Sequence, residues 1–145
     1  MNQERVNRIL EDLEKQPWVV KKYNRPGCYS ISIGEKLVYI GKSRNMLVRL
    51  AQHMDDTAHS NSHKYEVLRE AQSRGYNIKF DVLYCGGGVS QDEIDSDIGV
   101  REGELIRQYC PPLNTQIPFY CDYHRYKYNK SAKTITLGEI LGRVG

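Results

Sequence analysis

The chain has 145 residues, which is enough for one compact domain but not for two. Its net charge of +3 permits a nucleic-acid partner without requiring one, and its four cysteines form no CxxC pair, which excludes a zinc-ribbon spacing. It contains no run of about 18 apolar residues and begins with a polar segment, so we expect no transmembrane helix, no signal peptide and a cytoplasmic protein.

The first elements predicted along the chain are a helix and a β-hairpin. Apolar residues at helical spacing, with charged residues between them, predict an amphipathic helix over residues 2–15. Residues 28–33 and 37–41 are rich in Tyr, Ile and Val, which is typical of strands. Gly34-Glu35 between them predicts a tight turn, so the two strands should form a hairpin.

The middle of the chain is predicted to be mainly helical. A helix is expected over residues 45–54, followed by a polar loop over residues 55–62 and a second helix over residues 63–74. Gly75 stands where a glycine typically ends a helix. Residues 78–84 alternate apolar and charged side chains, which predicts a half-buried strand.

A last long helix is predicted over residues 91–110, beginning at a Ser90–Glu93 capping box and ending at Pro111-Pro112. A short C-terminal element with a second capping box is expected to begin at Thr136. The order of these elements predicts an α/β (α+β) fold, with a small mixed or antiparallel sheet of about three strands flanked by helices.

One carboxylate occupies an unexpected position on the long helix. Glu102 lies four residues after Ile98 and three before Leu105, on the face that the apolar residues define, whereas Glu104 points elsewhere. A buried carboxylate is costly unless it is paired or coordinates a metal. Glu102 therefore either forms a structural salt bridge with an Arg or Lys, or is a catalytic ligand for a hard cation such as Mg²⁺.

Two polar residues share one face of the helix that follows the hairpin. Arg49 and His53 are four residues apart, so their side chains project from the same side. They form either an ordinary solvated face, or a phosphate-binding guanidinium beside a group that titrates near neutral pH.

These residues belong to an ordered series of motifs that runs through most of the chain. The series consists of Gly27-Cys28-Tyr29, Tyr39-Ile40-Gly41, Lys42-Ser43, Arg49, His53, Glu102 and Leu113-Asn114. Ten positions separate the two tyrosines, ten separate the second tyrosine from the arginine, and twelve separate the glutamate from the last asparagine. Residues and spacings together resemble the GIY-YIG nuclease superfamily over residues 27–114, and this resemblance favours the metal-ligand interpretation of Glu102.

The chain departs from the family pattern in two places. Cys28 stands where isoleucine is usual, and replacing one apolar strand residue by a smaller one affects packing more than chemistry. The segment between Arg49 and Glu102 is longer than in the excision-repair members, and His59-Ser60-Asn61 within it is similar to phage-type homing nucleases. His53 also occurs in homing and restriction-type members.

The resemblance implies metal-dependent hydrolysis of a phosphodiester. Glu102 would hold Mg²⁺ or Mn²⁺, and Arg49 would donate to the phosphoryl oxygens. Tyr29 is the expected general base, ionised with the help of positive charge from Lys42 and Arg49. His53 is the alternative base, or a relay for the proton of the tyrosine.

The other motif residues are expected to position these groups. Tyr39 would position water or phosphate, Asn114 would fix the active-site loop through side-chain hydrogen bonds, and Gly27 and Gly41 are structural. A two-residue hairpin turn would put Tyr29 and Tyr39 on opposite faces, whereas a three-residue turn would put them on one face. The sequence is compatible with both turns. The tyrosines are also ordinary residues for strands.

Contacts to DNA are expected mainly from basic and polar residues outside the motifs. The candidates are Lys42, Arg44, His59, Asn61, Lys64, Arg125, Lys127 and Lys130. The last three belong to a basic, Tyr-rich tail over residues 119–145, where interleaved aromatic and basic residues suit phosphate contact and stacking. The alternative is a final strand or loop that packs its tyrosines on the core with its lysines outside.

We therefore predict one nuclease domain over residues 1–145, a stand-alone DNA endonuclease of phage, mobile-element or restriction type that depends on Mg²⁺ or Mn²⁺. The expected partner is double-stranded DNA, with no membrane. Because one active site cuts one strand, cutting both strands requires a homodimer or two binding events. The alternative is a catalytically silent or partner-dependent DNA-binding module of a repair or recombination assembly.

Overall fold

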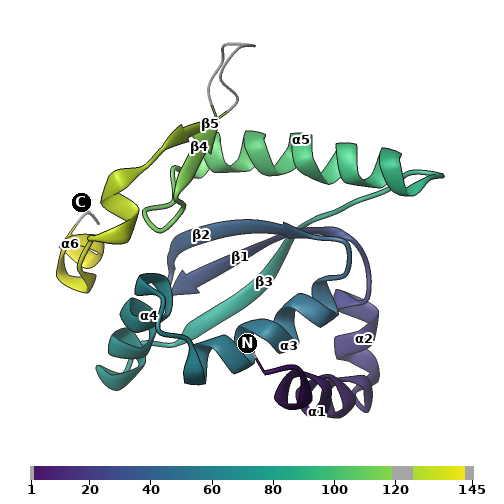
Figure 1. The fold of residues 1–145 in the computed structure, drawn as a ribbon, viewed down its shortest axis with the longest axis horizontal. Coiled ribbons are helices and arrows are strands. Elements are labelled where there is room, and N and C mark those ends of the chain that lie inside the picture. The colour runs from purple at the N-terminus through teal and green to yellow at the C-terminus, as the bar shows by residue number, and fades with distance from the viewer. Residues whose placement is uncertain (1, 119–125, 143–145) are drawn as a thin grey trace.

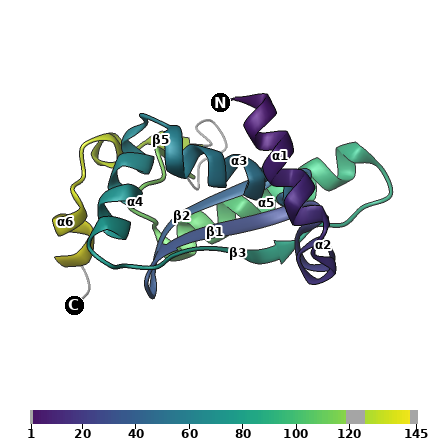
Figure 2. The same ribbon diagram turned by 90° about the horizontal axis from the view of Figure 1, so that it is seen from below.

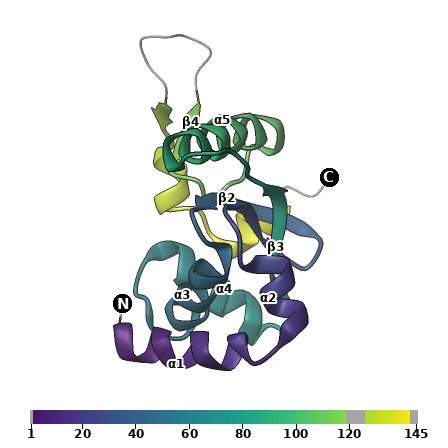
Figure 3. The same cartoon turned by 90° about the vertical axis from the view of Figure 1, so that its right-hand side faces the viewer.

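The computed structural model describes residues 2–118 and 126–142 and shows a layered α/β fold (Figures 1 and 3). A three-stranded antiparallel sheet of order β2-β1-β3 lies in the middle, with α5 on one face and α1 to α4 on the other. The elements are α1 (Gln3–Glu14), α2 (Pro17–Tyr23), β1 (Gly27–Ile33), β2 (Lys36–Ser43), α3 (Met46–His59), α4 (His63–Ser73), β3 (Ile78–Cys85), α5 (Gln91–Tyr109), β4 (Gln116–Pro118), β5 (Tyr126–Tyr128), η1 (Lys130–Lys133) and α6 (Leu137–Gly142). The predicted fold class is confirmed.

The main core lies between the sheet and the helices α1, α3 and α4. Figure 2 shows α1 and α3 on this side of the sheet and α5 behind it. Alternate residues of β1 point into the core because side chains alternate along a strand. With residues of α3 and α4 they form a cluster that includes Tyr29, Ile31, Ile33, Met46, Leu47, Ala51, Val67, Leu68 and Ala71. These residues anchor the elements from which the motif side chains project.

The β1–β2 hairpin turns through two residues. Ile33 pairs with Lys36, which leaves Gly34 and Glu35 in the turn, as predicted. Gly34 has a φ of 59°, a left-handed conformation that glycine adopts without strain. Without any further irregularity, this turn would place the two motif tyrosines on opposite faces of the sheet.

A bulge farther along β2 reverses that outcome. The register shifts so that Val38 is the extra residue, Ile31 pairs with Tyr39, and Tyr29 pairs with Gly41. The two tyrosines therefore lie on the same face, with their ring centroids 6.3 Å apart. The question left open by the sequence is resolved by a two-residue turn combined with a bulge.

Helix α3 is longer than the sequence predicts. Residues 55–59, expected to be loop, continue the helix, and the carboxylate of Asp55 is buried against α1. Arg5 of α1 donates to this carboxylate through Nε at 2.6 Å, which stabilises a charge in a position that looked solvent-exposed. The sequence analysis also misses α2, a seven-residue helix that begins with Pro17 at a position where proline is favourable.

The C-terminal residues of the described chain pack against α4. Thr136 and Glu139 cap α6 reciprocally, as predicted, because each side chain accepts a hydrogen bond from the backbone N–H of the other. The buried residues here are Ala132, Ile135, Leu137 and Ile140. Lys127 and Lys130 are exposed, and Tyr128 is 49% exposed, so aliphatic residues rather than this tyrosine make the core contacts. Within the described residues, the helices lack the combined length and apolar character needed to cross a bilayer.

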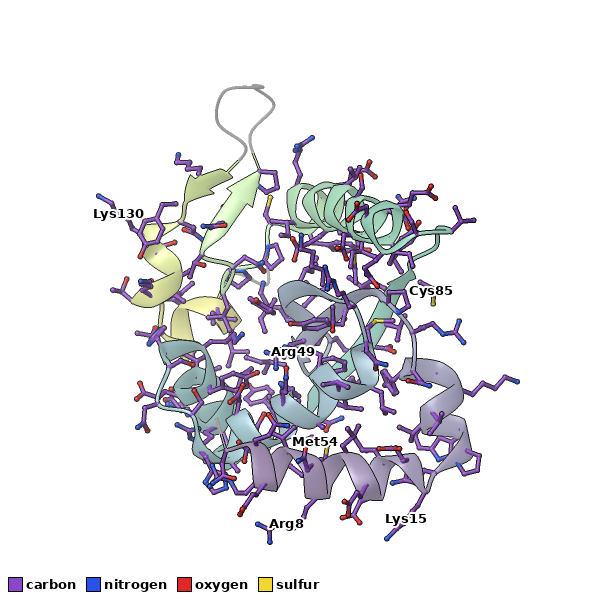
Figure 4. The ribbon with its side chains drawn as sticks, turned by 45° about the vertical axis from the view of Figure 1, so that its right-hand side comes forward. Arg8, Lys15, Arg49, Met54, Cys85 and Lys130 are labelled. Carbon is purple, nitrogen blue, oxygen red and sulfur yellow. The ribbon has the colours of Figure 1, made fainter. Side chains whose placement is uncertain are left out.

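We expect Arg5→Gln to destabilise the fold by about 2 kcal/mol, because it would remove the charged partner of the buried Asp55 carboxylate. The Asp55 side chain is 1% exposed, and its Oδ2 atom has no hydrogen-bond partner among the described residues. Urea denaturation followed by circular dichroism measures the free energy of unfolding. The matched control is Arg8→Gln, because Arg8 lies on the same helix and points into solvent (Figure 4). Equal effects of the two substitutions would contradict the prediction.

Candidate active site

Two motif residues, Leu113 and Asn114, lie along the outer edge of β2, which is an edge strand of the sheet. The N–H of Leu113 donates to the carbonyl of the bulged Val38 at 3.0 Å. The Asn114 side chain accepts from the Ile40 N–H at 2.9 Å and donates to the Ile40 carbonyl at 2.8 Å. Asn114 is 5% exposed, and its side chain takes the place that a neighbouring strand would occupy.

Two glycines allow close packing beside the site. A Cβ atom on Gly41 would overlap the ring and hydroxyl of Tyr29, which crosses the backbone at that point. A Cβ atom on Gly27 would overlap the carbonyl oxygen of Tyr84 and the side chain of Met46. Space, rather than backbone conformation, therefore restricts both positions to glycine.

Arg49 is held by hydroxyl groups from two different elements. Its Nε donates to the Tyr29 hydroxyl at 3.0 Å, and its Nη2 donates to the Tyr65 hydroxyl at 3.3 Å. Its Nη1 lies 3.7 Å from a carboxylate oxygen of Asp56. Figure 4 shows Arg49 reaching from α3 into the centre of the molecule. The guanidinium has more N–H donors than these hydrogen bonds use, so it can also donate to a ligand.

His53 lies one turn after Arg49 on α3 and is 5% exposed. Its Nδ1 lies 3.1 Å from the Tyr65 hydroxyl, and its ring centroid lies 5.2 Å from that of Phe80. Burial, together with the charges of Arg49 and Lys64, lowers the pKa of His53 to about 4. The histidine is therefore neutral at physiological pH and does not titrate in the range that its residue type alone suggests.

A cavity of about 490 Å³ opens between α3, α4 and the C-terminal segment. Its lining includes Tyr39, Arg49, Lys64, Tyr65 and Lys133. The Nζ atom of Lys64 lies over the Tyr39 ring, 3.9 Å from its centroid. Burial and the charge of Arg49 lower the pKa of Lys64 to about 8. Three cations, Arg49, Lys64 and Lys133, and one carboxylate, Asp56, therefore line the cavity, and this excess of positive charge suits an anionic ligand.

A smaller cavity of about 250 Å³ lies on the other side of Tyr39. Its lining includes Tyr39, Lys42, Glu102 and Asn114. Among the residues that the structure describes, Glu102 has no hydrogen bond or ion pair, so the salt-bridge interpretation finds no partner there. Burial raises the pKa of the Glu102 carboxyl, and the charge of Lys42 opposes that shift.

Tyr39 and Thr115 line both cavities. Burial raises the pKa of both Tyr39 and Tyr29, the charge of Glu102 adds to each shift, and the charge of Arg49 opposes it. Both phenols are therefore protonated at neutral pH. Tyr29 is 3% exposed and lines neither cavity, whereas Tyr39 lines both. The expected general base, Tyr29, thus lies below the surface of the cleft.

The residues expected to contact DNA are not all at this cleft. Lys42 and Lys64 line its cavities. Arg44 is already paired with Asp95 through hydrogen bonds of 2.6 and 3.0 Å. The residues that are exposed but line neither cavity are His59, Asn61, Lys127 and Lys130. Arg125 lies outside the described residues.

Tyr65 is a residue of the site that the sequence analysis does not single out. It lies three residues before Leu68 on the apolar stripe of α4, where a tyrosine is an ordinary packing residue. In the sequence, Tyr65 differs from an ordinary packing residue only in its position next to Lys64, a candidate phosphate contact. The structure brings its hydroxyl to both Arg49 and His53.

Two carboxylates line the cleft: Asp56, which lies 3.7 Å from Arg49 in the larger cavity, and Glu102 in the smaller one. Within the described part of the chain, no group of three or more His, Cys, Asp or Glu residues is placed to hold a metal. Mg²⁺ commonly binds through one or two carboxylates and completes its coordination with water and phosphate oxygens. The half-buried, unpaired Glu102 beside an open cavity fits that mode of binding.

The fold and the site define a small α+β protein with a cationic, tyrosine-lined cleft that also contains the carboxylate of Glu102. The chain is 30% identical over 112 residues to Endonuclease II of Enterobacteria phage T4, a match that covers 70% of this chain and 79% of the phage protein. The chain therefore belongs to the family of Endonuclease II. No family model matches the chain, and no solved structure matches it significantly.

The buried, neutral histidine makes stability depend on pH. Because burial lowers the pKa of His53 from 6.5 to about 4, the unfolded chain binds this proton more readily between those values. The contribution of the neutral His53 to the free energy of unfolding is fully present above pH 6.5. It falls as the pH drops through this window, by about 3 kcal/mol in all. Urea denaturation at several pH values measures the loss. His53→Gln should lose less stability over the same window, and an equal loss would contradict the assignment.

Proposed function

We propose that this chain is a divalent-metal-dependent endonuclease of the GIY-YIG type that hydrolyses phosphodiester bonds in double-stranded DNA. The similarity to Endonuclease II supports DNA cleavage, and the motif series supports the type. One observation carries the proposal. An unpaired Glu102 shares a cavity with Tyr39 and Lys42, and Arg49 lines the cavity on the other side of Tyr39.

The two cavities suit different parts of phosphodiester hydrolysis. In the larger one, Arg49 and Lys64 supply positive charge and N–H donors for the phosphate of a DNA strand. In the smaller one, Glu102 is the residue that would hold the divalent cation. When bound, Mg²⁺ or Mn²⁺ would supply Lewis-acid polarisation of the scissile phosphate. Tyr39 lines both cavities, so we assign it the contact with the attacking water.

We assign the general base by burial and by access to the cavities. Tyr29 and His53 are almost completely buried and line neither cavity, and the Nδ1 atom of His53 faces Tyr65. Tyr39 lines both cavities, and the charge of Glu102 is one cause of its raised pKa. Burial is the largest cause for both tyrosines, and Glu102 and Arg49 shift both pKa values in the same directions, so access to the cavities distinguishes Tyr39 from Tyr29. This favours Tyr39 as the group that accepts the proton of water.

Cleavage of supercoiled plasmid tests the proposal. The wild-type protein with Mg²⁺ or Mn²⁺ should nick or linearise the plasmid, and EDTA should stop the reaction. Glu102→Gln should slow cleavage about a hundredfold or more, because a neutral amide is a poor substitute for a carboxylate ligand. The matched control is Glu104→Gln on the same helix, because Glu104 is exposed and pairs with Arg101 at 3.2 Å. This control should cut as the wild type does.

Each other outcome of the plasmid assay has a defined meaning. Equal cutting by the two glutamate variants would show that Glu102 is structural. If the proteins bind DNA but none of them cuts, the chain is a DNA-binding module that is silent or needs a partner, and the proposal is wrong. Linear product without a nicked intermediate would indicate that a homodimer cuts both strands.

DNA binding should weaken as the pH rises through about 8, because Lys64 loses its charge in that range. Fluorescence anisotropy with a labelled duplex in metal-free buffer measures the affinity. Lys64→Met should bind more weakly at neutral pH and should lose this part of the pH dependence. The control is Lys15→Met, because Lys15 lies at the C-terminal end of α1 and points away from the site (Figure 4). An affinity of the wild type that stays constant over this range would contradict a role for Lys64.

A further inference from the structure

One buried tyrosine joins the two polar motif residues of α3. Tyr65, on α4, is 3% exposed. Its hydroxyl oxygen lies 3.3 Å from the Nη2 atom of Arg49 and 3.1 Å from the Nδ1 atom of His53. Because Arg49 and His53 project from the same face of α3, one hydroxyl group on the neighbouring helix reaches both.

The direction of each hydrogen bond follows from the chemistry of the groups. A guanidinium only donates, so the Tyr65 oxygen accepts from Arg49. We infer that the phenol donates its proton to the Nδ1 atom of His53, an arrangement that requires a neutral ring with its proton on Nε2. Burial lowers the pKa of His53 to about 4 and raises the pKa of Tyr65 to about 12, so both groups are in the required form at neutral pH.

We propose that Tyr65 is a positioning residue that orients the Arg49 guanidinium and fixes the tautomer of His53. The proposal rests on the proposed function, in which Arg49 contacts the phosphate of DNA. Tyr29 on β1 and Tyr65 on α4 accept from different nitrogens of Arg49, at 3.0 and 3.3 Å. The guanidinium plane therefore cannot rotate without breaking one of these bonds. Its other N–H groups remain available to the larger cavity, which Arg49 and Tyr65 both line.

A tyrosine that merely packs in the core is the competing explanation, and the chain contains a matched control for it. Tyr23 on α2 is 7% exposed, belongs to the same core, and donates through its hydroxyl to the Phe80 carbonyl at 3.1 Å. Tyr23→Phe therefore removes a buried hydroxyl and its hydrogen bond without touching Arg49 or His53. Any effect confined to Tyr65→Phe cannot be ascribed to the loss of a buried hydroxyl in general.

Nitrogen-15 NMR of histidine-labelled protein reads the tautomer directly, and His53→Gln identifies the signal. In the wild type we expect an unprotonated Nδ1 and a protonated Nε2, with the same pattern in Tyr23→Phe. In Tyr65→Phe the donor is gone, so the Nδ1 resonance should shift and the other tautomer should appear. A protonated Nδ1 in the wild type, or an unchanged spectrum in Tyr65→Phe, would overturn the proposal.

Single-turnover cleavage tests whether Tyr65 acts through Arg49. Tyr65→Phe should slow the cleavage step about tenfold with little change in DNA affinity, and Arg49→Ala should slow it about a hundredfold. In the Arg49→Ala background, Tyr65→Phe should add less than about a twofold effect, because its target is already gone. Tyr23→Phe should cut at the wild-type rate. Multiplicative effects of the Tyr65 and Arg49 substitutions would overturn the proposal.

The two measurements separate this proposal from the proposed function. If the wild-type chain does not cut DNA, the endonuclease proposal fails, while a tautomer change in Tyr65→Phe still supports the contact between Tyr65 and His53. If the wild type cuts and Tyr65→Phe changes neither the tautomer nor the rate, the endonuclease proposal stands and the positioning role of Tyr65 is wrong.

Discussion

One extra residue in an edge strand determines the geometry of the site. Without the bulge at Val38, the two-residue turn of the hairpin would put the two motif tyrosines on opposite faces of the sheet. With the bulge, Arg49 donates to Tyr29 and Lys64 lies over the ring of Tyr39 on the same face. The contacts between the tyrosines of the hairpin and the cations of α3 and α4 therefore depend on this register.

The bulge is stabilised from the open side of β2. An irregular strand at the edge of a sheet leaves backbone groups unpaired. Here Leu113 donates to the carbonyl of Val38, and the Asn114 side chain pairs with both backbone groups of Ile40. The same segment follows directly after α5, the helix that carries Glu102. Leu113 and Asn114, which hydrogen-bond to the backbone of β2, thus also connect this strand to the helix that carries Glu102.

The sequence predicts the elements better than it predicts their register or their ends. Alternation and the Gly34-Glu35 pair predict the hairpin, but Val38 is an ordinary β-branched strand residue, and no local feature marks it as extra. Asp55 looks like loop because it is charged, and the partner of its buried carboxylate, Arg5, lies far away in the sequence. The motif series includes residues that come together in the structure, such as Tyr29 and Arg49.

Which residues face the cleft depends on tertiary contacts that local patterns do not contain. Tyr29 and Tyr39 occupy equivalent motif positions, yet only Tyr39 lines the cavities. His53 is a titratable residue by type, but burial and the neighbouring cations keep it neutral. Tyr65 fits the apolar stripe of α4, so a residue that spans Arg49 and His53 is indistinguishable in sequence from one that only packs.

The cations Arg49 and Lys64 and the carboxylate of Glu102 line different cavities, so they do not neutralise one another and can each bind a ligand of opposite charge. Arg49 and Lys64 line one cavity, and the unpaired Glu102 lines the other. If Glu102 were paired with Arg49, each charge would offset the cost of burying the other, and neither would gain much from a further partner. Arg49 lies 3.7 Å from Asp56 but keeps N–H donors that can reach an anion, whereas Glu102 has no ion pair among the described residues and favours a cation. A phosphate that arrives with a divalent cation satisfies both requirements at once.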